Sequence, residues 1–258
     1  MAQALVEPLL NSGSFSADQV HAVVGSAATA QRLAQGTFEA VSIHPSGCSE
    51  ALQVWSAPVQ LLAVKPQQID AIAAAAPDVD HHPLLVSVLA GVSLDRLQRL
   101  FPGHRVVRAV PNTPALVGEG LTALAWGEAI SSEQRLKVRE LFAGVSEVLE
   151  LPEAKLDAFL ALTSSGPAFV ALMAEAMADG AVAAGLPRDL AHRLAHRTLA
   201  GTAALLDQRQ LHPATLKDMV TSPGGTTIAG VRALEQSGAR SAFMEAVIAA
   251  AERSRELA

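Results

Sequence analysis

Residues 84–110 read LLVSVLAGVSLDRLQRLFPGHRVVRAV, and this stretch decides the fold class. The apolar runs Leu84–Val88 and Arg105–Val110 are typical of buried strands, and the spacing over Leu94–Leu100 between them is helical. Apolar strands that are joined by a helix predict a parallel β-α-β unit in a sheet covered on both faces. The stretch therefore predicts an α/β fold with a doubly wound, Rossmann-like parallel sheet.

The rest of the N-terminal half repeats this alternation. Further strands are predicted at His21–Val24, Leu61–Val64 and Glu147–Leu151. Further helices are predicted at Ala28–Ala34, at Gln67–Ala75 and after a capping serine, Ser131. From Pro152 onward the pattern is helical throughout, so we predict two domains, residues 1–151 and residues 152–258. The first is a sheet domain able to hold a dinucleotide, and the second is an all-helical domain that closes over it or pairs with another subunit.

Composition narrows the classes of function. The chain has 258 residues, 50% of them apolar, and its net charge of −6 argues against nucleic-acid or membrane-surface partners. The single cysteine, Cys48, predicts a free thiol in a reducing, cytoplasmic location, and the N-terminus lacks the pattern of an export signal. The longest apolar region, residues 158–186, is interrupted by Gly166-Pro167 and carries Glu175 and Asp179. It therefore predicts buried helices of a globular protein and no membrane span.

The most informative motif is the segment TSPGGTTIAG at residues 221–230. Ser222 suits the N-cap of a helix and Pro223 suits the first helical position. The two glycines that follow leave first-turn amides bare, and each glycine costs about 1 kcal/mol relative to alanine in a helix. Such a helix start predicts a carboxylate or phosphate site, with an ordinary capped helix start as the alternative.

Segments along nearly the whole chain carry the pattern of one family. In the C-terminal half they are Ala161–Phe169 (ALTSSGPAF), Leu216–Asp218 (LKD), Thr221–Gly230 and Arg253–Leu257 (RSREL). In the N-terminal half they are Ala63–Pro66 (AVKP), Ala90–Val92 (AGV) and Arg108–Ala115 (RAVPNTPA). In order and spacing these segments resemble pyrroline-5-carboxylate reductases. The Ser-Pro-Gly-Gly-Thr-Thr and Pro-Asn-Thr-Pro motifs are highly specific when they occur together.

The resemblance implies an enzyme that reduces 1-pyrroline-5-carboxylate to L-proline with NAD(P)H, the final step of proline biosynthesis. Thr227 would hydrogen-bond the ring nitrogen as the catalytic group, which agrees with the need of an imine for a polar partner at nitrogen. The substrate-binding positions implied are Ser222, Gly224, Gly225, Thr226, Thr227 and Glu153. For Glu153 a solvated glutamate at a helix start is an equal alternative. A non-catalytic helical dimerisation protein and a β-hydroxyacid dehydrogenase are the competing functions.

The same resemblance implies a set of cofactor contacts at strand ends. They are Met1, Ala2, Ser26, Ala63, Val64, Lys65, Pro66, Ala90, Asn112 and Thr113. The segment Gly25–Thr29 has no acid to bind the ribose hydroxyls of NAD, and Arg32 follows it, which favours NADPH while NADH stays possible. No metal is expected, because the helical pair His192 and His196 lies beside arginines and reads as a solvated basic face.

The chain departs from the family pattern at its start. Met1-Ala2-Gln3-Ala4-Leu5 resembles the end of a Gly-x-Gly turn and the helix after it, so we expect the first strand and the pyrophosphate-binding glycines to be missing. An internal methionine taken as the start, or a damaged copy, would explain this, and such a chain would bind cofactor poorly. The resemblance also implies a homodimer or higher homo-oligomer formed through the C-terminal helices.

Overall fold

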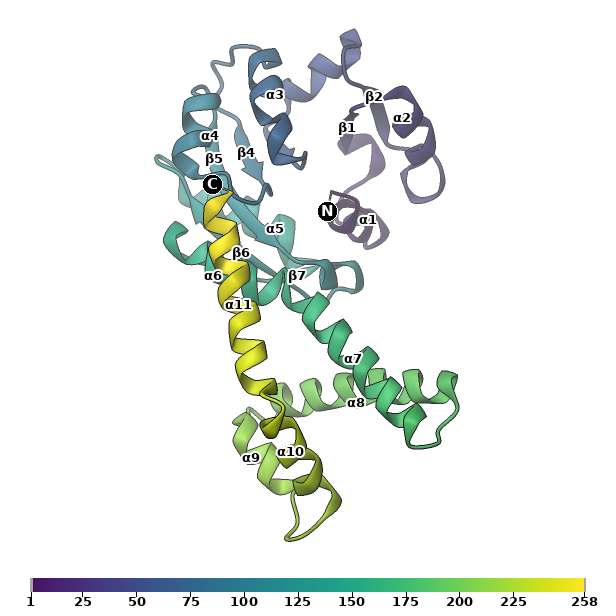
Figure 1. The fold of residues 1–258 in the computed structure, drawn as a ribbon. Coiled ribbons are helices and arrows are strands. Elements are labelled where there is room, and N and C mark those ends of the chain that lie inside the picture. Colours follow the sequence, from purple (N-terminus) through teal and green to yellow (C-terminus); the bar gives the residue numbers. More distant parts are fainter. Residues whose placement is uncertain (1, 258) are drawn as a thin grey trace. The chain divides into compact units, whose positions relative to one another are not determined.

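The computed structural model describes residues 2–257, which divide into two units by their contacts (Figure 1). The first unit contains residues 2–164 together with residues 251–257, and the second contains residues 165–250. The predicted domain boundary at residues 151 and 152 falls inside the first unit. The reason is packing, because Leu156 is fully buried against Val110, Ala123 and Ala125 of the sheet.

The first unit is built on a five-stranded sheet. Its strands in spatial order are β3 (Val59–Leu62), β4 (Leu84–Ser87), β5 (Arg105–Pro111), β6 (Gly120–Trp126) and β7 (Ser146–Glu150). Strands β3, β4 and β5 are parallel neighbours, but β6 runs antiparallel to β5, so the prediction of a wholly parallel sheet was wrong there. The connection is too short for a crossover helix, since only residues 112–119 separate the strands, and they contain the 3-10 turn η5 (Thr113–Val117) and Gly118 at φ +77°.

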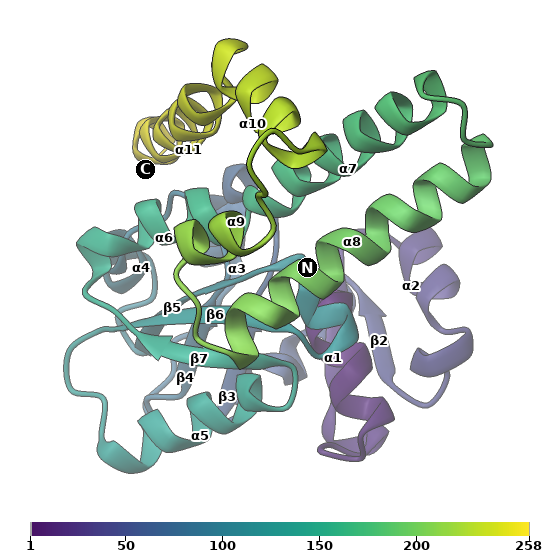
Figure 2. The same cartoon turned by 90° about the horizontal axis from the view of Figure 1, so that it is seen from below.

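Helices cover both faces of this sheet (Figure 2). One face is covered by α1 (Ala2–Asn11) and α5 (Ser132–Ala143), and the other by α3 (Ile69–Ala75), α4 (Leu94–Leu100) and α6 (Leu156–Thr163). Alternate residues of one strand serve the two sides: Val107 faces α1 and α5, whereas Val106 faces α3 and α4. This is the period-two pattern expected of a strand buried on both faces.

A second, two-stranded sheet lies in the same unit. It pairs β1 (His21–Val24) with β2 (Ser42–Pro45) in parallel, and α2 (Ala27–Leu33) connects the two strands. Within residues 2–257, α1 is preceded by no strand, and β1 and β3 each have only one neighbour. The predicted strands and helices of the N-terminal half are confirmed to within two residues, whereas β2 and β6 were not predicted.

The second unit is entirely helical. Its helices are α7 (Gly166–Ala183), α8 (Arg188–Gln208), α9 (Pro213–Met219), α10 (Thr226–Gln236) and most of α11 (Ala239–Glu256). Helices α7 and α8 pack through small side chains, of which Ala178 and Ala191 are the most buried. Several apolar side chains of this unit are exposed in the single chain, among them Leu172 and Met244 at 66% and 60%. Exposed apolar side chains on such helices are typical of a surface that another subunit covers.

The apolar region that begins at Glu153 forms two helices. By length and composition Glu153–Ala183 passes for a membrane-crossing segment, and little of it is buried within the chain. The helical pattern breaks at Ser164 and Ser165, where α6 ends and α7 is about to begin. Helix α6 packs on the sheet of the first unit, so its apolar side chains contribute to the protein core.

Candidate active site

The predicted cofactor contacts follow the carboxyl ends of parallel strands. Because β3, β4 and β5 are parallel neighbours, the segments after them lie at one edge of the sheet, where open α/β sheets bind their ligands. Residues 63–66 follow β3, Ala90 follows β4, and Asn112 with Thr113 follows β5. Lys65, Ala90 and Thr113 are exposed there, so this edge offers accessible groups to a ligand.

Asn112 is the exception among these predicted contacts. Its side chain is buried, with its Nδ2 donating to the carbonyl of Thr163 at 3.1 Å and its Oδ1 accepting from the amide of Leu121 at 2.8 Å. These bonds fix the start of the β5–β6 connection and the end of α6. The structure therefore gives the Asn112 side chain a structural role, and its contact with the cofactor stays a prediction.

The end of β1 presents hydroxyl groups. Ser26 is the N-cap of α2, and its Oγ accepts from the amide of Thr29 at 3.2 Å while lying 3.0 Å from the hydroxyl oxygen of that residue. Gly25, Ser26 and Ala27 are exposed, and Arg32 lies in the last turn of α2. Hydroxyls and a nearby cation, with no carboxylate in residues 25–29, fit the extra phosphate of NADP better than the bare ribose of NAD.

Two further predicted contacts concern the N-terminus. Ala2 is the first residue of α1 and is half-buried. Met1 lies outside the described residues.

The loop between β4 and α4, residues 88–93, is held at several points. Leu89 and Val92 are buried in the core below α4, and between them Gly91 has φ +71°, a conformation that favours glycine. Ser93 is the N-cap of α4, with its Oγ accepting from the amide of Arg96 at 3.2 Å. Only Ala90 of this loop is exposed, so the loop presents one small residue at the sheet edge.

Glu153 accepts a hydrogen bond from the first residue of α4. Its Oε1 accepts from the amide of Leu94 at 2.7 Å and from Nη1 of Arg108 at 3.1 Å. Arg108, in the middle of β5, is 4% exposed. Its buried positive charge is stabilised by this carboxylate and by Asp157, whose Oδ1 is 3.8 Å from Nη2. Glu153 is thus engaged within the first unit and is not a freely solvated glutamate, and its contact with substrate stays a prediction.

The segment after α9 forms a tight turn before it forms a helix. The amide of Gly225 donates to the carbonyl of Ser222 at 3.1 Å, and Gly224 has φ +67°. Proline followed by a glycine of positive φ is the signature of a type II turn. The prediction that Ser222 caps the helix and that Pro223 begins it was therefore wrong. The N-cap is Gly225, and α10 begins at Thr226.

The start of α10 is bare. No described side chain caps it, and the first intrahelical acceptor, the carbonyl of Gly225, receives the amide of Ala229. A Cβ at Gly225 would displace Oγ of Ser222 and would lie 3.2 Å from the carbonyl oxygen of Ser222, so this position favours glycine. Thr226 is exposed and Thr227 half-exposed beside the free amides. This helix start offers amides without partners, the positive end of the helix dipole and two hydroxyls. Such a set of hydrogen-bond donors can bind a small carboxylate.

Sequence reasoning missed the partners of Arg108. An arginine inside the otherwise apolar strand RVVRAVP signals a buried ion pair, but nothing in the sequence pattern names its partners. They are Glu153 and Asp157, and Asp157 also accepts a hydrogen bond from Ser254. Within residues 2–257 no group of three or more His, Cys, Asp or Glu side chains could hold a metal ion.

The sheet edge and the bare helix start define a class of protein, an oxidoreductase that pairs a dinucleotide-binding domain with a helical domain. Comparison with known proteins gives the same class in both halves. Residues 1–91 match the family model described as NADP oxidoreductase, coenzyme F420-dependent. Residues 153–257 match the model described as pyrroline-5-carboxylate reductase dimerisation.

Whole-chain relatives are more specific. A pyrroline-5-carboxylate reductase of Synechocystis is 47% identical over all of this chain and 94% of its own length, and one of Arabidopsis thaliana is 40% identical over 100% and 92%. The chain therefore belongs to the pyrroline-5-carboxylate reductase family. A crystal structure of the Plasmodium falciparum pyrroline carboxylate reductase with NADP bound has a TM-score of 0.88 at 25% identity, covering 99% of this chain and 93% of its own.

These alignments bear on the expected truncation. Because they take in nearly the full length of the relatives, the comparisons do not support the prediction that this is an N-terminally shortened member. The expectation of impaired cofactor binding stays a prediction. The predicted family and fold class are confirmed.

Proposed function

We propose that this chain reduces 1-pyrroline-5-carboxylate to L-proline with NADPH, as the name of its Synechocystis relative states for that protein. The observation that carries the proposal is the bare start of α10. A carboxylate is the acceptor that free first-turn amides favour, and the substrate carries one beside its imine. Gly224 and Gly225 leave the approach to these amides open, because neither has a side chain.

The proposed role of Thr227 follows from its place one residue inside the helix. Its hydroxyl, half-exposed beside the amides that hold the carboxylate, hydrogen-bonds the ring nitrogen. An imine carbon accepts hydride readily once its nitrogen is protonated or hydrogen-bonded, so a hydroxyl suffices as polar partner. Thr226 and the backbone of residues 224–225 orient the ring, and bound NADPH supplies the hydride for the imine carbon.

The proposed cofactor is NADPH. It is supported by the hydroxyls of Ser26 and Thr29, by the lack of an acid in residues 25–29, and by the NADP that the Plasmodium falciparum neighbour binds. Lys65, Ala90 and Thr113 would contact it at the carboxyl edge of the sheet. Cys48 is the single cysteine, and we place the protein in the cytoplasm as part of the same proposal.

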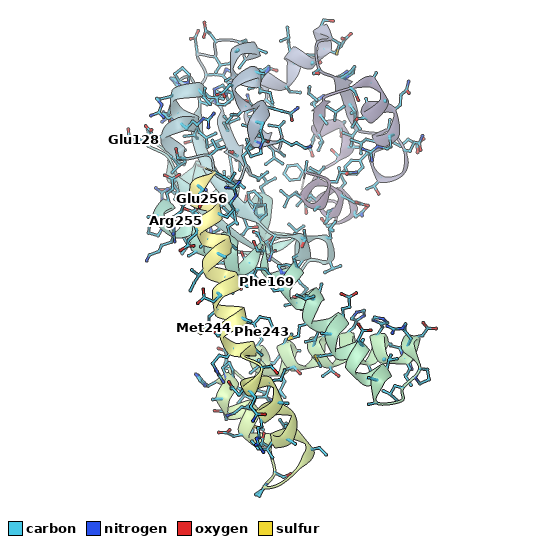
Figure 3. The ribbon with its side chains drawn as sticks, in the orientation of Figure 1. Glu128, Phe169, Phe243, Met244, Arg255 and Glu256 are labelled. Atoms are coloured by element: carbon cyan, nitrogen blue, oxygen red, sulfur yellow. The ribbon has the colours of Figure 1, made fainter. Side chains whose placement is uncertain are left out.

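The proposed assembly is a homodimer or a higher homo-oligomer through the second unit. Exposed apolar side chains on its helices support it, including Leu172, Met177, Phe243 and Met244, of which the last two are labelled in Figure 3. The family model that matches residues 153–257 is itself a dimerisation model. Burial of these side chains by a second copy removes them from water, which favours association.

The test is NADPH oxidation with 1-pyrroline-5-carboxylate by the full chain and by Thr227→Ala. We expect kcat/KM to fall by about a hundredfold or more, the size typical for loss of a group that assists proton transfer. Thr202→Ala, an exposed threonine of α8, is the matched control and is expected to keep wild-type rates. Equal rates in all three proteins would remove Thr227 from the site. An oligomer that binds no NADPH and reduces nothing would favour the helical dimerisation protein instead.

A further inference from the structure

The last turn of α11 touches the loop that follows β4. Gly91 of this loop is buried, and a Cβ built on it would lie 2.8 Å from the carbonyl oxygen of Leu257 and 3.1 Å from its Cβ. The backbone of Leu257 therefore rests directly on Gly91. Glycine is needed at this position twice over, for its φ of +71° and for this close approach.

A second connection runs from the same turn to the other end of the loop. The hydroxyl of Ser254 donates to Oδ1 of Asp157 at 2.7 Å, and that oxygen lies 3.8 Å from Nη2 of Arg108. Arg108 donates to Glu153, and Glu153 accepts from the amide of Leu94, the first residue of α4. Three hydrogen bonds and one longer ion pair, between Arg108 and Asp157, thus link Ser254 to the point where the loop enters α4.

These contacts share one stripe of α11. Ala251, Ser254 and Leu257 are spaced three apart, so they lie along one side of the helix end. Ala251 and Ser254 are 6% and 5% exposed, in contrast to Arg253 and Glu256, which form an exposed ion pair. Arg255 and Glu256 mark this last turn in Figure 3. The stripe belongs to the first unit, together with the loop that it contacts.

We propose that the C-terminal turn, residues 254–257, is a positioning element for the β4–α4 loop and thereby sets the affinity for NADPH. The loop presents Ala90 at the carboxyl edge of the sheet. The C-terminal turn contacts this loop directly at Gly91 and is linked to Leu94 through side chains of the first unit. The inference rests on the proposed function, since that function places the cofactor against Ala90. The turn touches no substrate or cofactor, so its effect passes through the loop.

The experiment compares NADPH dissociation constants, measured by binding titration without substrate, with steady-state constants. The variants are Ser254→Ala and a chain shortened after Glu256, which lacks Leu257. Ser254→Ala is expected to raise the dissociation constant and the KM for NADPH by about threefold to tenfold, the range for loss of one hydrogen bond, and the shortened chain at least as much. The kcat and the KM for 1-pyrroline-5-carboxylate are expected to stay within about twofold of the wild type.

The matched control is Ser241→Ala, which removes an exposed hydroxyl from the same helix and is expected to change nothing. Wild-type NADPH affinity in Ser254→Ala would overturn the proposal, as would a fall in kcat with unchanged affinity. If the shortened chain does not fold, as judged by circular dichroism, Ser254→Ala decides the matter. A wild-type chain that binds NADPH but does not reduce the imino acid refutes the proposed function alone, because the affinity comparison still tests the C-terminal turn.

Discussion

Two helices of this protein begin in opposite ways. Helix α4 starts at Ser93, whose hydroxyl accepts an amide, and Glu153 takes the amide of Leu94. Helix α10 starts at Gly225, and no described side chain caps it. A closed helix start stabilises the fold, whereas an open one costs stability and leaves donors for a ligand. In the proposed function, the free amides at the start of α10 are the donors that bind the substrate carboxylate.

The largest effect is expected from a variant that blocks the free amides at the start of α10. In Gly225→Glu the new side chain meets Ser222 and brings a carboxylate to the free amides. We expect kcat/KM for 1-pyrroline-5-carboxylate to fall by about a thousandfold, as when a charged group blocks a preorganised binding site. Gly230→Ala is the control, because a Cβ at Gly230 has open space around it, and it is expected to keep full activity. Substantial activity in Gly225→Glu would show that the substrate binds elsewhere.

The capped start of α4 is tested by removing Arg108, the buried cation that pairs with Glu153. Arg108→Ala leaves Glu153 without its cation and Asp157 without its partner, so the free energy of unfolding is expected to fall by about 3–5 kcal/mol in urea denaturation. Arg99→Ala removes an exposed arginine that pairs with Asp95 and is expected to cost less than about 1 kcal/mol. Similar losses in the two variants would contradict the assigned role of Arg108.

A smaller effect is expected from the cap of α4 itself. Ser93→Ala removes the acceptor for the amide of Arg96 and is expected to lower the free energy of unfolding by about 1 kcal/mol. Because this helix start serves the fold, kcat at saturating NADPH is expected to stay at the wild-type value. A loss of kcat without loss of stability would mean that α4 takes part in chemistry.

The smallest effect concerns the buried core near the amino end of β5. Burial lowers the pKa of His104, and its Nε2 lies 3.0 Å from Oε1 of Gln60. The unfolded chain therefore binds a proton at higher pH than the folded chain does. Stability is expected to be full above the ordinary pKa of about 6.5 and to fall as the pH drops from there through the lowered value. His104→Gln is expected to reduce this pH dependence in urea titrations at several pH values, and an unchanged dependence would exclude His104 as its source.

Sequence periodicity predicted most of the first unit. The apolar runs of β4 and β5 predicted strands and the spacing of α4 predicted a helix, and the structure confirms all three elements. Strand β6 was missed because GLTALAW is short, mostly small and apolar, and follows a turn. Its direction depends on the length of the connection after Asn112, which an alternation of strands and helices does not reveal.

The candidate site was predicted in part. The open start of α10 followed from its paired glycines, but Ser-Pro-Gly-Gly satisfies both a capped helix and a type II turn. The hydrogen bond from Gly225 to Ser222 and the positive φ of Gly224 decide between them only in three dimensions. Asp157 and Gly91 contact residues near the C-terminus, and such contacts between distant parts of the chain are not encoded in local patterns. Asn112 likewise reads as a turn residue until its two partners are seen.

The most direct test of the account is a crystal structure of the protein with NADPH and a proline-like carboxylate. We expect the carboxylate to accept hydrogen bonds from the first amides of α10, with the hydroxyl of Thr227 beside the ring nitrogen. A carboxylate bound at another place, with residues 222–227 free of ligand, would contradict it.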